Sequence, residues 1–162
     1  MATLFELCKQ GQLIRVDAAL GPEEMDQRCL YLLPKVRDWI ESTLQHLVST
    51  WEVETSPIEQ LDELLHRFCV GKPLQHGKRY KKLDPRGKHV WELKTGDLRI
   101  FGWFPQIDMF VICAIHPTHA VKKHGLYAGF RDEVIRVRAA LELDEPKCIE
   151  GDDYDDVLSN CA

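Results

Sequence analysis

The feature that most constrains the fold is a change in the spacing of apolar residues near residue 79. From there, four short segments rich in β-branched and aromatic side chains follow one another at 79–83, 89–94, 98–104 and 109–115. The stretches between them contain the turn-forming residues Pro, Gly and Asp and are too short to hold a helical crossover. Strands joined by such short turns pair antiparallel, so this region predicts an antiparallel meander.

In the N-terminal half, the apolar spacing is mostly helical. The segment 12–20 alternates weakly and predicts a first strand, after which Pro22 opens a helical region that Pro34 kinks or restarts. Apolar residues within 36–48 recur at helical intervals and form one stripe. These residues predict a first long helix.

A second helix has both start and stop signals. Ser56 is suited to the N-cap, Pro57 to the first turn and Glu59 to a capping box, while Gly71 offers a C-terminal stop. After the meander, apolar residues at helical intervals predict a closing helix over 126–143.

Together these elements predict the α+β class, with a small antiparallel sheet of three or four strands packed with two N-terminal helices and one C-terminal helix. We expect one domain over 1–145, with an extended N-terminal helical part, and an acidic, disordered tail over 146–162. No apolar run approaches the roughly 18–20 residues of a membrane span, and the first residues lack the pattern of a signal peptide. None of the six cysteines forms a Cys-x-x-Cys motif, so we expect reduced thiols in a cytoplasmic protein.

The net charge of −5 conceals opposite charges in neighbouring regions of the chain. Residues 71–140 carry a net charge of +8, whereas residues 141–162 carry −7. A stretch this basic suits a polyanion such as nucleic acid, and the alternative is a solvated surface balanced by its acidic flanks. Because the tail directly follows the last helix, it would either cover the basic surface as a polyanion mimic or only keep the protein soluble.

The sheet region and the segment after it carry a recognisable motif. It consists of a Trp-Glu-Leu strand at 91–93, a strand with Arg99, the apolar strand 110–115 and the pair Lys122-Lys123 before the last helix. In this order the motif resembles the RelE/ParE toxin superfamily, and within it the phage-derived, HigB-like branch. The resemblance covers roughly residues 56–142, while the long N-terminal section and the acidic tail depart from the family.

The resemblance implies a RelE-like fold and the toxin of a toxin–antitoxin pair. Such a toxin is a ribosome-dependent endonuclease that cleaves mRNA without a metal or other cofactor, using the 2′-hydroxyl as internal nucleophile. The implied partners are a cognate antitoxin protein and mRNA on the ribosome. Two alternatives share the fold: a non-catalytic binding module of phage or mobile-element origin, and a ParE-like gyrase inhibitor that cuts nothing.

Three residues are candidate catalytic groups. The reaction needs a base for the 2′-hydroxyl, cations for the charge that builds on the phosphate, and an acid for the leaving 5′-oxygen. Glu92 is the candidate base, Arg99 the candidate phosphate ligand and His116 the candidate acid or base. The alternative for Glu92 and Arg99 is an exposed ion pair between neighbouring strands. For His116 it is a strand-end imidazole bonded to a backbone carbonyl.

Two basic segments are candidate RNA contacts. The first places one aromatic ring among four cations and comprises Lys78, Arg79, Tyr80, Lys81 and Lys82. The second is the pair Lys122 and Lys123, suited to backbone phosphates. A basic edge strand and a solvated loop are the respective alternatives.

A zinc site is the remaining possibility among the histidines. His116, His119 and His124 together would supply three imidazoles. However, Pro117 breaks the helical spacing between the first two, and no cysteine lies nearby. We therefore expect no metal site.

Overall fold

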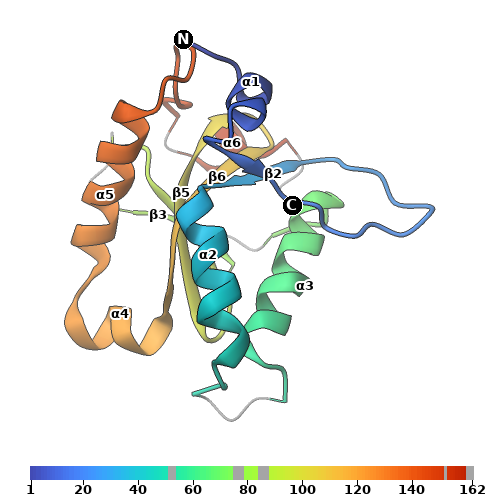
Figure 1. Ribbon diagram of the computed structural model, residues 1–162, viewed down its shortest axis with the longest axis vertical. Coiled ribbons are helices and arrows are strands. Elements are labelled where there is room, and N and C mark those ends of the chain that lie inside the picture. Colours follow the sequence, from blue (N-terminus) through green and yellow to red (C-terminus); the bar gives the residue numbers. More distant parts are fainter. Residues whose placement is uncertain (51–53, 75–78, 84–87, 152, 160–162) are drawn as a thin grey trace.

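The computed structural model describes residues 1–50, 54–74, 79–83, 88–151 and 153–159 and is organised around one mixed β-sheet (Figure 1). The six strands among these residues are β1 (Ile14–Arg15), β2 (Cys29–Leu32), β3 (Tyr80–Lys82), β4 (Trp91–Lys94), β5 (Leu98–Gln106) and β6 (Met109–Pro117). They lie in the order β1-β2-β6-β5-β4-β3. β2 and β6 run parallel, and the other neighbouring strands run antiparallel. The predicted α+β class is confirmed.

The predicted meander corresponds to β3, β4, β5 and β6, which pair in sequence order. The sheet is larger than the three or four strands predicted, because β2 adds to β6 in parallel and β1 adds to β2. β2 lies in a segment that the sequence predicted to be helical. Its residues, CLYL, form a short apolar run, and such a run does not distinguish a buried strand from a helix. Its parallel partner lies far along the chain, where local patterns give no signal.

The helices described are α1 (Leu4–Lys9), α2 (Pro34–Ser42), α3 (Pro57–Cys69), α4 (Thr118–His124), α5 (Tyr127–Ala140) and α6 (Tyr154–Val157), with a 3₁₀ turn at Leu44–His46. α3 begins as predicted, since Ser56 Oγ accepts a hydrogen bond from Glu59 N–H and the Glu59 carboxylate accepts one from Ser56 N–H. Pro34 starts α2 instead of kinking a longer helix, and the sequence did not predict α1 or α4. Across the described ranges, no helix combines the length and the apolar character that crossing a membrane requires.

Helices cover both faces of the sheet. In Figure 1, α3 lies on one side of the strands, and α4 and α5 lie on the other. On the α3 face, Phe68 packs against Phe110 of β6 with ring centroids 6.5 Å apart. On the α5 face, Phe101 of β5 stacks on Phe130 at 4.7 Å with nearly parallel rings. Because side chains alternate along a strand, residues level with Phe101 on neighbouring strands also face α5.

The C-terminal segment is folded onto the sheet over the part that the structure describes, where the sequence predicted a disordered tail. The Trp103 indole donates a hydrogen bond to Lys147 O at 2.9 Å, and Ile149 N–H donates to Phe104 O at 2.9 Å. α6 then buries Val157 and Leu158 in the core. A helix of four residues is too short to show a period in the sequence.

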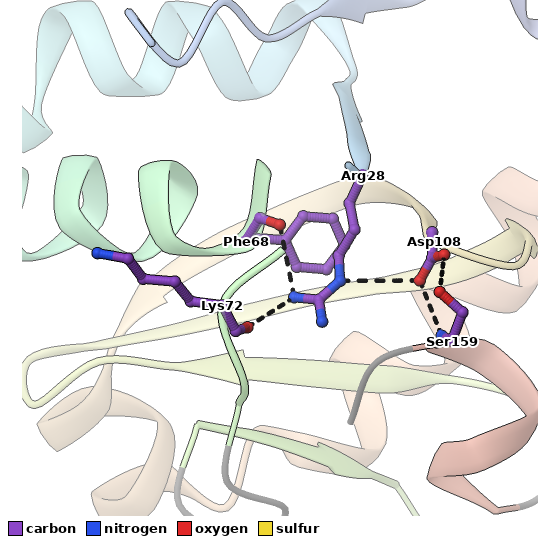
Figure 2. Close-up of polar contacts among 5 residues, drawn as sticks. All are labelled: Arg28, Phe68, Lys72, Asp108 and Ser159. Carbon is purple, nitrogen blue, oxygen red and sulfur yellow. Dashed lines mark hydrogen bonds and ion pairs between the residues drawn. The ribbon is translucent and has the colours of Figure 1, made fainter. Parts of the chain in front are cut away.

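A polar cluster holds the end of this segment against the turn between β5 and β6 (Figure 2). Arg28, only 2% exposed, donates from Nη1 to Lys72 O at 3.0 Å and lies over the Phe68 ring at 5.3 Å. Its Nε is 3.7 Å from Asp108 Oδ1. Asp108 in turn accepts hydrogen bonds from the backbone N–H of Ser159, at 2.9 Å, and from its hydroxyl. We call Arg28, Asp108 and Ser159 the anchor cluster.

Candidate functional site

An open cleft of about 520 Å³ lies on the α5 face, between strands β3, β4 and β5 on one side and helices α4 and α5 on the other. It is lined by Lys81, Leu83, Glu92, Lys94, Arg99, Lys122, Tyr127, Ala128 and Arg131. Among these described residues, five are cations and one is a carboxylate. We call this the basic cleft, because its charge suits an anionic ligand.

The strand side of the basic cleft follows from register and side-chain alternation. Lys81 is paired with Glu92 across β3 and β4, and Lys94 is paired with Arg99 across β4 and β5. Glu92 and Lys94 are two residues apart, so they share a face of β4. Directly opposed residues in antiparallel strands also share a face, so all four side chains point toward α5.

The helix side is formed by the connection that follows β6. Lys122 comes from α4, which ends at Gly125 in a left-handed conformation, with φ of 60°. This conformation allows the chain to turn directly into α5. Tyr127 and Arg131 lie four residues apart on α5 and therefore on one side of that helix.

Glu92 is a buried carboxylate with an incomplete set of partners. Its residue is 2% exposed, and Lys94 Nζ lies 3.5 Å from its Oε1. Among the described residues, no donor forms a hydrogen bond with its Oε2, which is shielded from solvent. Burial raises the pKa of Glu92 above its ordinary value, and nearby Lys94 and Arg99 oppose this rise only in part. Glu92 is therefore unusually ready to accept a proton for a carboxylate.

Arg99 is held firmly on one side only. It is 9% exposed, and its Nη1 donates to Thr95 O at 2.7 Å, Leu98 O at 3.1 Å and Thr118 Oγ1 at 3.0 Å. Its Nε has no hydrogen-bond acceptor within the described chain. The carboxylate of Glu92 pairs with Lys94, so the ion pair considered between Glu92 and Arg99 is not the one observed.

His116 is the one catalytic candidate of the three that does not line the basic cleft. It is paired with Arg99 across β5 and β6. Its ring instead lies 5.2 Å from that of Phe130. Burial, with a smaller contribution from His119, lowers the pKa of His116 and favours its neutral form. Glu92 and Arg99 thus share the basic cleft, whereas His116, the cross-strand neighbour of Arg99, packs against Phe130.

The candidate RNA contacts are divided between the cleft, the surface and the core. Lys81 and Lys122 line the basic cleft, whereas the exposed Lys123 lies outside its lining, as do Arg79 and Lys82. Tyr80 requires a correction, because it is fully buried and stacks on Trp91 at 6.0 Å. Strand alternation turns it to the α3 face, so it presents no ring to a base. Lys78 lies outside the described residues.

Besides the apolar Leu83 and Ala128, sequence reasoning missed three polar residues of the cleft, namely Lys94, Tyr127 and Arg131. Lys94 had a usable signal, since it lies two residues after Glu92 on a predicted strand. The two residues on α5 gave a weaker signal, because a sequence period identifies a helix face but not the strands that this face meets.

Metal-binding residue types are scattered in this structure. Over the described ranges, no group of three or more His, Cys, Asp or Glu side chains is arranged to hold a metal ion. His119 instead lies with its Nδ1 3.3 Å from Thr50 Oγ1.

The chain was compared with known proteins in three ways. No family model matches it, no curated protein matches it, and no solved structure matches it. Inferences about function therefore depend on the geometry of the basic cleft and on the motif within residues 56–142.

Proposed function

We propose that the basic cleft binds RNA and cleaves it by attack of a 2′-hydroxyl on the neighbouring phosphate. The observation that carries this proposal is a buried carboxylate with a raised pKa, Glu92, placed among five cations in an open cleft. A single carboxylate among cations is a poor ligand set for Mg²⁺ or Ca²⁺, which bind several oxygen ligands. The same combination suits proton transfer beside a phosphate.

Each step is assigned to residues of the cleft. Glu92 takes the proton of the 2′-hydroxyl while the hydroxyl oxygen bonds to phosphorus, which produces a 2′,3′-cyclic phosphate. The bond from phosphorus to the 5′-oxygen breaks, and that oxygen takes a proton from solvent. Arg99 and Lys94 on the strands, with Lys122 and Arg131 on the helices, stabilise the charge that develops on the phosphate oxygens.

The biological setting is proposed from the motif at 91–123. Its resemblance to the RelE/ParE superfamily suggests a toxin of a toxin–antitoxin pair that cuts mRNA on the ribosome and is neutralised by an antitoxin protein. The cleft supports this setting by placing Glu92, Arg99 and Lys122, all residues of that motif, around one space.

A binding module without catalysis is the second candidate. It is favoured by the position of His116 outside the cleft, so that no histidine among the described lining residues supplies an acid. It is also favoured by the shielding of Glu92 Oε2 from solvent. In this case the cations would hold an RNA backbone that is never cut.

The test compares Glu92→Gln with the native protein on naked single-stranded RNA and on mRNA bound to ribosomes. We expect the native protein to cleave at least one of these substrates. In Glu92→Gln the cleavage rate should fall about 10²–10⁴-fold, while the affinity for RNA should not fall. Lys122→Ala should weaken RNA binding, while Lys123→Ala, its exposed neighbour outside the cleft, serves as the matched control. RNA binding without cleavage of either substrate would establish the binding module instead.

A further inference from the structure

The N-terminal end of α5 forms part of the basic cleft. Tyr127 and Ala128, its first two residues, line the cleft, and the helix continues for 14 residues. The N–H of Leu126, which precedes the helix, donates to Val121 O at 3.1 Å. Within α5 itself, the first backbone N–H that bonds back along the chain is that of Phe130, which donates to Leu126 O at 3.1 Å. The N–H groups of the three residues before Phe130 have no acceptor within the helix, and no side chain of the described residues caps this end. Such an end carries partial positive charge and free donors.

A second observation on the opposite wall points to an anionic ligand. Arg99 is 9% exposed, and its three hydrogen bonds to described residues all leave from Nη1. Its Nε–H has no acceptor among the described residues. A buried donor without an acceptor is unfavourable, and a ligand oxygen would supply the missing partner.

Arg99 is hydrogen-bonded to the segment that leads from β6 to α5. The hydroxyl of Thr118, the first residue of α4, accepts a hydrogen bond from Arg99 Nη1. α4 then leads through Gly125 to α5. The orientation of the guanidinium is therefore fixed relative to the helices that form the other wall. The volume of the cleft, about 520 Å³, is within the range of sites that hold nucleotide-sized ligands.

We infer that the basic cleft contains a phosphate subsite formed by the first backbone N–H groups of α5 and the guanidinium of Arg99. A phosphate has several acceptor oxygens and accepts hydrogen bonds from both walls at once. The inference rests on the proposed function in assigning this phosphate to an RNA backbone. The phosphate subsite itself does not depend on that assignment, because it is inferred from the backbone N–H groups of α5 and the Nε–H of Arg99.

The subsite is tested by ¹H–¹⁵N NMR titration of the full chain with inorganic phosphate, adenosine 3′-monophosphate and a short RNA. We expect saturable shifts in the amide signals of Tyr127, Ala128 and Gly129 and in the side-chain Nε–H of Arg99. Arg99→Lys keeps the positive charge but removes the Nε–H, and it should weaken phosphate binding at least about tenfold. Lys9→Ala, which removes an exposed cation at the end of α1 that does not line the cleft, should bind as the native protein does.

A second variant addresses the helix end directly. Ala128→Pro removes one N–H from the first turn, a position where proline is compatible with a helix, and should also weaken phosphate binding. Ala128→Gly keeps the N–H and serves as its control. Thermal unfolding of each variant separates a loss of binding from a loss of fold.

The outcomes separate the subsite from the proposed function. RNA cleavage without amide shifts at the start of α5 would overturn the subsite and leave the proposed function standing. Saturable phosphate binding at these amides, with RNA neither bound nor cut, would retain the subsite and overturn the proposed function. Shifts spread over exposed lysines and abolished by modest salt would show diffuse ion binding only, which also overturns the subsite.

Discussion

Two buried arginines near opposite ends of β5 have different surroundings. Arg28, in the anchor cluster, donates to two backbone carbonyls, lies over the Phe68 ring and faces the carboxylate of Asp108. Within the part of the chain that the structure describes, Arg99, in the basic cleft, has its hydrogen bonds on Nη1 only. The protein supplies the acceptors and the opposing charge around Arg28, whereas the Nε of Arg99 has no acceptor among the described residues, and our proposal assigns a ligand oxygen to it. The first arrangement indicates a structural role and the second a binding role.

Two buried carboxylates repeat this contrast. Asp97, in the turn between β4 and β5, is 4% exposed and accepts hydrogen bonds from Thr50 N–H at 3.0 Å and from the Gln60 amide at 2.6 Å. Its own N–H donates to Gln60 Oε1, which ties the turn to α3. Glu92, two strand positions before the end of β4, has Lys94 beside one oxygen and no hydrogen-bond donor on the other among the described residues. Burial alone therefore does not distinguish a functional charge from a structural one. We base the distinction on whether the described residues supply hydrogen-bond partners for all the polar atoms of the charged group.

The largest expected effect is on the structural arginine. Arg28→Met should lower the free energy of unfolding by about 3–5 kcal/mol, because it breaks a buried ion pair and leaves two carbonyls without their donor. RNA affinity per folded molecule should not change. Arg99→Met should instead lower the free energy of unfolding less than Arg28→Met does and should strongly weaken RNA binding. Urea unfolding and RNA titration of both variants provide the comparison, and equal profiles for the two would remove the distinction.

Removal of residues 153–162 tests the role of the acidic tail. The deletion takes away Val157 and Leu158, and burying each such side chain is worth about 1.5–3 kcal/mol before the cost of ordering the helix. We expect a loss of a few kcal/mol in stability and unchanged RNA affinity, since Asp108, which holds this segment, follows the end of β5 opposite to Arg99. Tighter RNA binding at low salt in the truncated protein would instead support the tail as a cover of the basic cleft.

Replacing each of the two buried carboxylates, Asp97 and Glu92, by its amide should change the free energy of unfolding in opposite directions. Asp97→Asn should lower the free energy of unfolding by about 1–3 kcal/mol, because one of its two hydrogen-bonded oxygens is replaced by an NH2 group that faces another donor. Glu92→Gln should raise it by about 1 kcal/mol at neutral pH, as expected when a functional group is held at a cost in stability. The folded-state pKa of Glu92 is raised, so its carboxylate lowers stability as pH rises through that pKa. The gain in Glu92→Gln should accordingly shrink at acid pH, and a gain independent of pH would contradict this reasoning.

The smallest effect is expected at His116. Because it lies outside the basic cleft, His116→Gln should change the rate of RNA cleavage by less than about tenfold, against the 10²–10⁴-fold of a positioned acid or base. The rate should be measured under single-turnover conditions. A larger loss would mean that α5 moves enough during the reaction to admit this histidine.

The sequence predicted those parts of the fold and site that depend on local signals. The cap of α3, the antiparallel meander and the shared face of Glu92 and Arg99 follow from residue types and alternation. β2 was not predicted because its partner, β6, is distant in sequence and parallel. The burial of Tyr80 and the packing of His116 outside the cleft lining were not predicted for a related reason. Their neighbours, Trp91 and Phe130, come from packing between elements, which a period in the sequence does not specify.

The most direct test of Glu92 as the base is the pH dependence of RNA cleavage in the native protein and in Glu92→Gln. Because the base acts only as a carboxylate, the native rate should rise with pH through an apparent pKa above the ordinary glutamate value of 4.5. Residual cleavage by Glu92→Gln should lack this rise. The same pH-dependent rise in both proteins would show that Glu92 is not the base and that the basic cleft only binds its ligand.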